Sequence, residues 1–347
     1  MEDFKDNVYD RVIVNNDRDF IENDNVDVSA TYIVLCEDNY ENNVNKAMYD
    51  YKVSGLSLAE WVAMACESRP VFITINKNEK FLNLIKPYME NNDYTIVLYA
   101  DTPLVSKTHL KDLLGYVERK RLNVCKLKRG YILKNEYISQ VDEIYSSLVY
   151  DLSSNDFFQV SNFNDVEKIR ETLESRMFGF HKKNGVIFYN QDSAIVDANV
   201  QIGYGTKIAG GSSLLKNSLI GKNVDIQANA VIINSKIGDG VTIGASCLIE
   251  NSIVKSGSVL RPQTLLSHSV IGESVIIGIG SKIVSSAVKD NVGIGDFCNI
   301  ESINVLENVK IGVASTIVGV DVVAAIDENS VIQAGAKIIR KNMENND

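Results

Sequence analysis

Residues 220–244 read IGKNVDIQANAVIINSKIGDGVTIG, and aliphatic residues recur in this stretch at a nearly constant spacing. Ile220, Ile226 and Ile232 are six residues apart, and the period resumes after a slip of one residue at Ile237. A short strand of about six residues places one aliphatic side chain in a core, and a following Gly, Asn or Asp permits a tight turn. Three such strands would close a triangular coil, and stacked coils would bury a continuous aliphatic column.

The period extends over roughly 194–339, which corresponds to about eight coils of three hexapeptides each. Of the 22 glycines, 17 lie between Gly203 and Gly335, where the turns are expected. An ordinary β-sandwich, the rival architecture, would show strict alternation and longer turns. The pattern resembles the hexapeptide-repeat family, whose fold is a left-handed parallel β-helix.

The first half of the chain alternates between apolar runs typical of strands and amphipathic stretches typical of helices. The expected strands are 31–36, 70–75 and 94–100, and the expected helices are 57–68, 80–91, 107–121 and 165–178. Alternation of this kind predicts an α/β domain with a mainly parallel sheet and helices on both faces. Ligands of such sheets bind beyond the carboxyl ends of the strands, and Asp101 follows one of those ends.

Composition restricts the possible partners and surroundings of the protein. A chain of 347 residues suggests two domains, and a net charge of -10 argues against a nucleic-acid groove. No apolar run approaches the roughly 20 residues of a membrane span, and the acidic N-terminus lacks signal-peptide features, so we expect a cytoplasmic protein without a membrane partner. The five cysteines are scattered, which predicts buried, reduced thiols and no zinc site.

The motif YADTPL (99–104), followed by a hexapeptide β-helix, resembles the bacterial bifunctional UDP-N-acetylglucosamine pyrophosphorylase/glucosamine-1-phosphate acetyltransferase family. KVSGLSLAEWV (52–62) and GVIFYNQDSAIVDANVQIG (185–203) also resemble that family. The resemblance implies a Rossmann-like nucleotidyltransferase domain that transfers a nucleotidyl group from a nucleoside triphosphate to a sugar 1-phosphate, assisted by Mg²⁺. It divides the chain into four segments. These are a truncated nucleotidyltransferase-like domain (1–180), a linker (181–193), the β-helix (194–339) and a charged tail (340–347).

The same resemblance implies that Asp101 is a metal ligand. The family's second metal ligand is an Asn just before the connector helix, where this chain reads QVSNF (159–163). Strict register places Ser161 at that position, and a shift of one residue would place Asn162 there. A cap for the following helix, with Asp165 in its first turn, is the alternative interpretation of both residues.

The phosphate-binding residues implied by the resemblance are incomplete. The stretch 36–52 contains neither Gly nor Arg, although the family has a glycine-rich loop there that ends in an essential Arg and Lys. Lys46 is the candidate for the catalytic and phosphate-binding lysine, with Lys52 as second choice, and a solvated loop lysine is the alternative for both. Lys126 and Lys128, with the neighbouring Arg129, could contact an anion or form a solvated basic turn.

The β-helix departs from the family's acetyltransferase site. Arg261 belongs to the retained L-R-P, and Lys282 to a retained G-x-G-S-K segment. Ser285 stands where the family has its catalytic His, and a Ser cannot act as the general base for an amine. We interpret His268 as an outward-facing turn residue that lies out of register with that position. We therefore expect neither acetyltransferase activity nor a role for acetyl-CoA.

Three hypotheses follow from these patterns. The first is a nucleotidyltransferase of sugar-nucleotide metabolism with Mg²⁺ at Asp101. The second is a catalytically degenerate protein that binds a nucleotide or sugar nucleotide, or serves as a trimeric scaffold or regulator. The third is a hexapeptide acyltransferase with a site at Arg261, Lys282 and Ser285. All three are compatible with a homotrimer formed through the β-helix.

Overall fold

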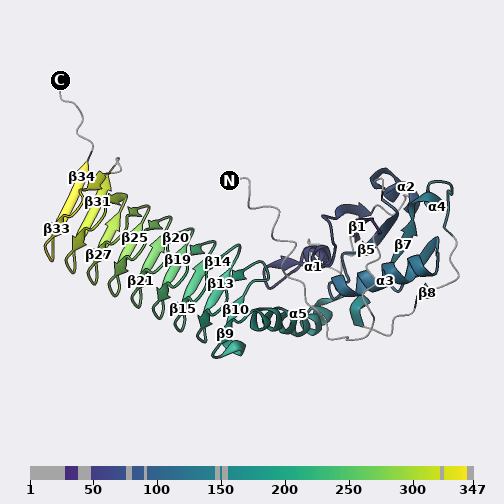
Figure 1. The fold of residues 1–347 in the computed structure, drawn as a ribbon, viewed down its shortest axis with the longest axis horizontal. Helices are drawn as coiled ribbons and strands as arrows, with labels where there is room; N and C mark the ends of the chain where they lie inside the picture. The colour runs from purple at the N-terminus through teal and green to yellow at the C-terminus, as the bar shows by residue number, and fades with distance from the viewer. Residues whose placement is uncertain are drawn as a thin grey trace, which may run out of the picture. The chain divides into compact units, whose positions relative to one another are not determined.

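The computed structural model describes residues 28–37, 48–75, 80–89, 92–144, 149–150, 155–320 and 324–341. The chain forms two compact units, Met1–Phe180 and His181–Asp347. Strands and helices build the first unit, and stacked coils of short strands build the second (Figure 1).

The first unit is built on a six-stranded sheet in the order β4-β1-β5-β7-β6-β8. Its strands are β1 (Ala30–Glu37), β4 (Val71–Ile75), β5 (Tyr94–Tyr99), β6 (Val124–Leu127), β7 (Gly130–Lys134) and β8 (Val149–Tyr150). β1 is parallel to β4 and β5, whereas β7 is antiparallel to both β5 and β6. The prediction of an α/β unit is therefore supported, but the sheet is mixed, and it does not clearly show a Rossmann-like nucleotidyltransferase domain. The sheet is mixed because the tight β6–β7 hairpin reverses the direction of the chain. A glycine is needed in this hairpin, since a Cβ atom at Gly130 would lie 2.4 Å from the Val97 carbonyl oxygen.

Helices cover both faces of this sheet. The helices are α1 (Leu58–Met64), α2 (Phe81–Ile85), α3 (Lys107–Arg119), α4 (Asn135–Ile138) and α5 (Phe163–Lys183), and a short hairpin pairs β2 (Lys52–Val53) with β3 (Leu56–Ser57). One apolar core joins side chains of β1 to those of α1 and α3, and a second core joins the opposite face to α2 and α4. α2 is shorter than predicted because the chain passes into a 3-10 turn at Lys86–Tyr88, which contains Pro87.

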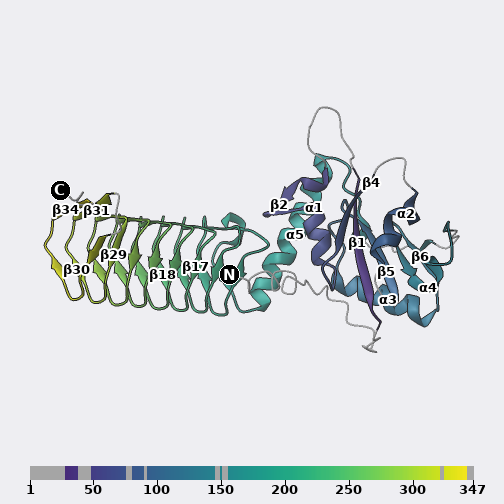
Figure 2. The same ribbon diagram turned by 90° about the horizontal axis from the view of Figure 1, so that it is seen from above.

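The second unit is a left-handed parallel β-helix with three faces, and Figure 2 shows its coils stacked one on the next. Face A consists of β10 (Ile195–Val196), β13 (Ser213–Leu215), β16 (Val231–Ile233), β19 (Leu248–Glu250), β22 (Leu265–Ser267), β25 (Lys282–Val284), β28 (Asn299–Glu301), β31 (Thr316–Val320) and β34 (Lys337–Lys341). Face B consists of β11 (Gln201–Ile202), β14 (Leu219–Ile220), β17 (Lys236–Ile237), β20 (Ile253–Val254), β23 (Val270–Ile271), β26 (Ala287–Val288), β29 (Ile303–Val305) and β32 (Ala324–Ile326). Face C consists of β9 (Ile187–Phe188), β12 (Lys207–Ile208), β15 (Asp225–Ile226), β18 (Thr242–Ile243), β21 (Val259–Leu260), β24 (Ile276–Ile277), β27 (Gly293–Ile294), β30 (Lys310–Ile311) and β33 (Val331–Ile332). The β-helix has about nine coils, where the period predicted about eight.

The coils shorten by one residue after the second repeat. Leu214 pairs with Ile232, which is a step of three full hexapeptides. The next two steps, from Ile232 to Ile249 and from there to Leu266, are each one residue shorter. The missing residue is at the corner where face A turns into face B, which we call the A–B corner. A period of three full hexapeptides therefore misaligns residues on successive coils, and the slip seen in the sequence recurs once per coil.

Buried serines line the inside of the A–B corner. Backbone N–H groups of Ser252 and Ser269 donate to the hydroxyl oxygens one coil earlier, Ser235 Oγ at 3.0 Å and Ser252 Oγ at 3.1 Å. This row of hydroxyls satisfies backbone donors that the tight corner withdraws from solvent. All five cysteines are buried and none forms a disulfide, as predicted. Among the described helices, none combines the length and apolar character needed to cross a membrane.

Candidate functional site

Asp101 lies directly beyond the carboxyl end of β5, as predicted, and is 8% exposed. Its carboxylate accepts hydrogen bonds from Arg129 Nε at 3.2 Å, Arg129 Nη2 at 2.9 Å and Gln159 Nε2 at 2.9 Å. The same Arg129 guanidinium pairs with Glu37 and lies 3.9 Å from the centre of the Tyr99 ring. Burial lowers the pKa of Arg129, but Asp101 and Glu37 together raise it above its ordinary value. An internal cation therefore occupies the place that the resemblance assigned to Mg²⁺.

The predicted partner segment does lie beside Asp101, but its side chains are used otherwise. Val160 N–H donates to the Asp101 carbonyl at 2.8 Å, which brings residues 159–162 to this edge of the sheet. Asn162 Oδ1 accepts from Asp165 N–H at 3.0 Å, and Ser161 N–H donates to Asp165 Oδ2 at 3.1 Å. Asn162 thus caps α5, and Asp165 in the first turn binds the backbone of the residue before the cap, as the alternative interpretation of the two residues held. In the described ranges, no group of three or more His, Cys, Asp and Glu side chains could hold a metal ion.

The candidate phosphate-binding lysines are dispersed. Lys46 lies outside the described residues. Lys52 lies on β2 and borders an open cavity of about 510 Å³, and Lys128 is exposed at the β6–β7 turn. Lys126 lines a different cavity, of about 380 Å³. The structure thus brings none of these described lysines to Asp101, and Arg129, which was predicted only as a possible anion contact, binds Asp101 instead.

The A–B corner carries an exposed row of polar side chains on successive coils. Asn234 Nδ2 donates to Asn251 Oδ1 at 2.8 Å, and Asn251 Nδ2 lies 3.4 Å from His268 Nε2. His268 Nδ1 lies 2.9 Å from Ser267 Oγ. The backbone of each residue in the row is left-handed, with φ of 46° at Asn234, 47° at Asn251 and 49° at His268. Asn tolerates this conformation better than most residues, which explains its presence there.

Asn251 Oδ1 accepts from Asn234, so the Asn251 amide group that faces His268 is its NH2. Beside that donor, a neutral His268 ring would accept at Nε2 and donate from Nδ1 to Ser267 Oγ. The separation of 3.4 Å at Nε2 is long for a hydrogen bond.

The register of the coils corrects our interpretation of His268. Ser267 pairs with Val284, so His268 and Ser285 occupy the same position of the A–B corner on adjacent coils. The interpretation that His268 is out of register was wrong because it assumed three full hexapeptides in every coil. Its exposure on a turn, by contrast, is confirmed.

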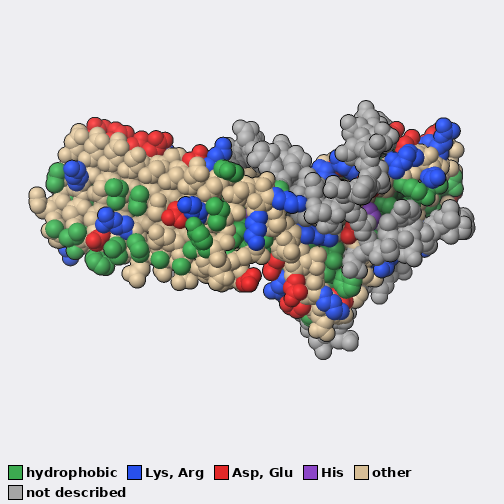
Figure 3. Space-filling view, turned by 60° about the horizontal axis from the view of Figure 1, so that its bottom comes forward, with side chains coloured by type: hydrophobic (Ala, Val, Ile, Leu, Met, Phe, Trp, Pro, Cys, Tyr) green, Lys and Arg blue, Asp and Glu red, His purple; other side chains and the backbone are tan. Residues whose placement is uncertain are grey.

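The other predicted β-helix residues are not gathered at this corner. Arg261 follows β21, where face C turns into face A, and forms an exposed ion pair of 3.7 Å with Asp296. Lys282 begins β25 on face A and is exposed, and Ser285 follows the same strand at the A–B corner. No contact joins Arg261 to Lys282 or Ser285 among the described residues. On the surface in Figure 3, the Lys and Arg side chains of the coils are dispersed, while acidic side chains gather along one border.

Comparison with known proteins gives no family for the chain. No family model matches it, and no curated protein matches it. Among solved structures, UDP-N-acetylglucosamine O-acyltransferase from Moraxella catarrhalis is 15% identical, with 44% of this chain and 66% of that chain covered and a TM-score of 0.25. The acetyltransferase domain of PglB from Neisseria gonorrhoeae is 18% identical, with 44% and 63% covered and a TM-score of 0.21. The chain thus covers less than two thirds of these two neighbours.

PerB from Caulobacter crescentus, solved in complex with CoA and GDP-perosamine, is 12% identical over 86% of this chain and 92% of that chain, with a TM-score of 0.19. All these neighbours are acyl- or acetyltransferases. They contradict three predictions: nucleotidyl transfer assisted by Mg²⁺, the absence of acetyltransferase activity, and the exclusion of acetyl-CoA. The physical reason for the first correction is that Arg129 occupies the Asp101 carboxylate. For the other two, the prediction considered only Ser285 at this corner, whereas His268 lies at the equivalent position one coil earlier.

Proposed function

We propose that this protein is an acyltransferase that acts through its β-helix, with His268 as the general base. The observation that carries the proposal is the row of contacts from Asn234 to Ser267, in which a neutral His268 would donate from Nδ1 to Ser267 Oγ and keep its Nε2 lone pair at an exposed corner. A base must present a lone pair within hydrogen-bond reach of the proton that it removes, and we assign this role to Nε2.

The reaction needs a group that takes a proton from the attacking amine or hydroxyl and later gives it to the leaving thiolate. An amine or hydroxyl of the acceptor attacks the carbonyl carbon of an acyl thioester, and His268 Nε2 takes the acceptor's proton as the new C–N or C–O bond forms. The tetrahedral intermediate then expels the thiolate as the C–S bond breaks. The imidazolium returns the proton to the sulfur, which regenerates the neutral histidine. Ser267 Oγ, as partner of Nδ1–H, would keep the ring oriented through both steps.

We further propose a homotrimer through the β-helix and a sugar nucleotide as acceptor. Large apolar side chains are exposed on both faces beside the corner: Leu248 (36% exposed) on face A, and Ile253 (43%) and Val270 (41%) on face B. A second copy packed against these side chains would bury them and enclose His268 in a groove. A sugar nucleotide is the acceptor class to test first, because PerB was solved with one bound.

The experiment measures thiol release from acetyl-CoA with a panel of amino-sugar and hydroxyl-sugar nucleotides, and identifies the product by mass spectrometry. We expect His268→Asn to reduce kcat/KM at least a hundredfold, since general-base catalysis contributes about 10²–10⁴-fold. Asn fits this corner, as Asn234 and Asn251 show. Ser302→Asn, a matched change at the same corner two coils further on, should retain activity.

Two outcomes would overturn the proposal. One is that the wild-type protein acylates no member of the panel. That result would favour the hypothesis of a catalytically degenerate binding protein or scaffold. The other is a His268→Asn variant as active as the wild type, which would leave the reaction without this base.

A further inference from the structure

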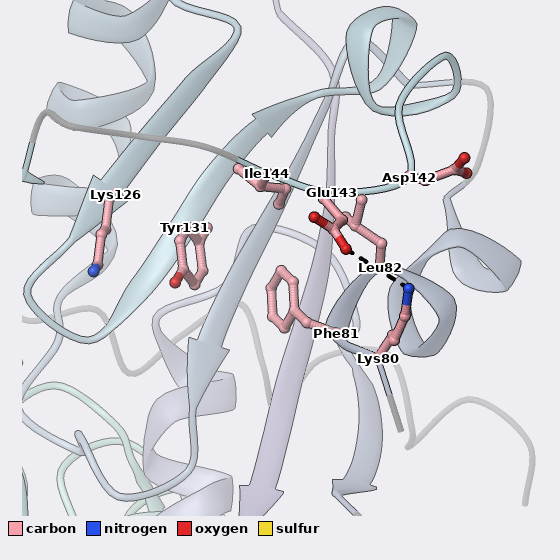
Figure 4. A pocket seen from close by; sticks show the side chains of 8 residues that line it. All are labelled: Lys80, Phe81, Leu82, Lys126, Tyr131, Asp142, Glu143 and Ile144. Atoms are coloured by element: carbon pink, nitrogen blue, oxygen red, sulfur yellow. Dashed lines mark ion pairs between the residues drawn. The ribbon is translucent and has the colours of Figure 1, made fainter. Parts of the chain in front are cut away.

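A second cavity, in the α/β unit, lies apart from Asp101. It has a volume of about 380 Å³ and is lined by α2, β6, β7 and the segment that follows α4, which includes Glu143 and Ile144. Small-molecule sites usually measure about 300–1,000 Å³, so this cavity suits a ligand with one ring system and one charged group. Figure 4 shows the side chains that line it.

The wall of the cavity is aromatic. Phe81 on α2 and Tyr131 on β7 have ring centres 5.0 Å apart at an interplanar angle of 49°. Both rings are partly exposed, and Ile144 lies beside them in the close-up (Figure 4). Two adjoining aromatic rings that remain accessible offer a flat apolar surface on which a planar ring can stack.

One end of the cavity is cationic. Lys126 lies directly opposite Tyr131 in the antiparallel pair of β6 and β7, so the two side chains are neighbours on one face of the sheet. The Lys126 amine and the Tyr131 hydroxyl point to the same side in Figure 4. Within the described part of the chain, neither polar group has a hydrogen bond or ion pair.

The charges of the lining sum to zero, with Lys80 and Lys126 against Asp142 and Glu143. Lys80 lies 3.7 Å from Glu143, and Asp142 lies 3.9 Å from Lys86, which is outside the lining on the 3-10 turn that follows α2. Ion pairs with exposed side chains contribute little to stability and can rearrange around a ligand. Because both acids have these partners, Lys126 is the lining cation without an ion pair among the described residues, at the end where the Tyr131 hydroxyl can also donate.

We propose that this cavity binds a nucleoside monophosphate, with the base against Phe81 and Tyr131 and the phosphate on Lys126 and the Tyr131 hydroxyl. Stacking a base on an aromatic side chain contributes about 1–3 kcal/mol, and a charge-assisted hydrogen bond to phosphate is about twice as strong as a neutral one. The proposal does not depend on acyl transfer, because binding is measured without turnover.

The test is calorimetric titration of the full chain with UMP, AMP, uridine, inorganic phosphate and glucosamine 1-phosphate. We expect a saturable site for UMP or AMP that binds uridine and phosphate at least tenfold more weakly. Lys126→Gln should weaken the nucleotide at least tenfold and leave uridine unchanged, and Phe81→Leu should weaken nucleotide and nucleoside alike. Lys128→Gln, exposed at the adjoining turn, is the matched control and should bind as the wild type does.

Three results would overturn this assignment: the absence of saturable nucleotide binding at millimolar concentration, an equal loss in Lys126→Gln and Lys128→Gln, or glucosamine 1-phosphate binding as tightly as UMP. The last result would show that the aromatic wall contributes no contact with a base.

Discussion

The Asp101 edge of the α/β unit and the A–B corner of the β-helix both concentrate polar side chains, but they complete their hydrogen bonds in opposite ways. At the sheet edge, Arg129 and Gln159 occupy the Asp101 carboxylate from within the same unit. At the corner, the row of amides ends on an exposed histidine, whose Nε2 lies 3.4 Å from Asn251 Nδ2. A polar cluster that is saturated internally stabilises the fold, whereas one that ends at the surface with an open acceptor can act on a ligand.

The largest effect should come from removing the internal cation. Arg129→Met leaves Asp101 and Glu37 side by side without their partner, and breaking such a pair costs about 3–5 kcal/mol when it is buried. Because the side chains of Arg129 and Glu37 are 22% and 33% exposed, we expect a loss at the lower end of that range. Trp61, the one tryptophan and 5% exposed, reports unfolding of the α/β unit by its fluorescence in urea.

The control for this experiment is the double variant Asp101→Asn, Arg129→Met, which removes one of the two stranded charges. It should recover part of the lost free energy of unfolding. A single Arg129→Met variant as stable as the wild type would show that the sheet edge is not closed by this contact.

The next largest effect is a pH dependence of stability that we expect from His181, one of the two histidines of the β-helix unit. His181, at the end of α5, is 2% exposed, and burial lowers its pKa from 6.5 to about 4. The unfolded chain therefore takes up a proton at higher pH than the folded one, and stability is lost as pH falls from 6.5 towards 4. At about 1.4 kcal/mol per pKa unit, the loss approaches about 3 kcal/mol. His181→Leu should flatten this dependence in denaturation followed by circular dichroism, whereas His268→Asn should retain it.

A smaller loss is expected from the buried hydroxyl row inside the A–B corner. Ser252 Oγ donates to the Glu250 carbonyl at 2.7 Å and accepts from Ser269 N–H. Ser252→Ala leaves that buried N–H without its acceptor, which should cost about 2 kcal/mol in the unfolding of the β-helix. Ser256→Ala, at an exposed turn, should change stability by less than about 0.5 kcal/mol. Equal losses in the two variants would show that the inner row does not hold the corner.

The smallest expected effect concerns the outer row. Asn251→Gly keeps the left-handed backbone but removes the amide that orients His268, and kcat for acyl transfer should fall about tenfold, or about 1.4 kcal/mol, with KM changed little. Asn234→Gly, one coil further from His268, should reduce kcat less. An equal reduction in both variants, or none in either, would show that the amide row does not position the base.

Local patterns predicted much of this molecule. The hexapeptide period predicted the β-helix, and the apolar runs predicted β1, β4 and β5 at nearly their observed bounds. Asp101 was correctly placed at a strand end, since the residue after a buried strand is visible in the sequence. Its partner was not, because Arg129 reaches it through the β6–β7 hairpin, beyond the whole of α3 in the chain, and no local signal marks that contact.

The sequence by itself determined the repeating core and the turns of the β-helix, because each short strand repeats the same local requirement for one buried aliphatic residue and a tight turn after it. Only the tertiary structure decided which side chains meet. Because the coils after the second repeat are one residue shorter, Asn234, Asn251, His268 and Ser285 occupy the same corner position on successive coils. Contacts between coils and across the mixed sheet depend on the summed geometry of all intervening residues, so they follow from the fold and not from any single motif.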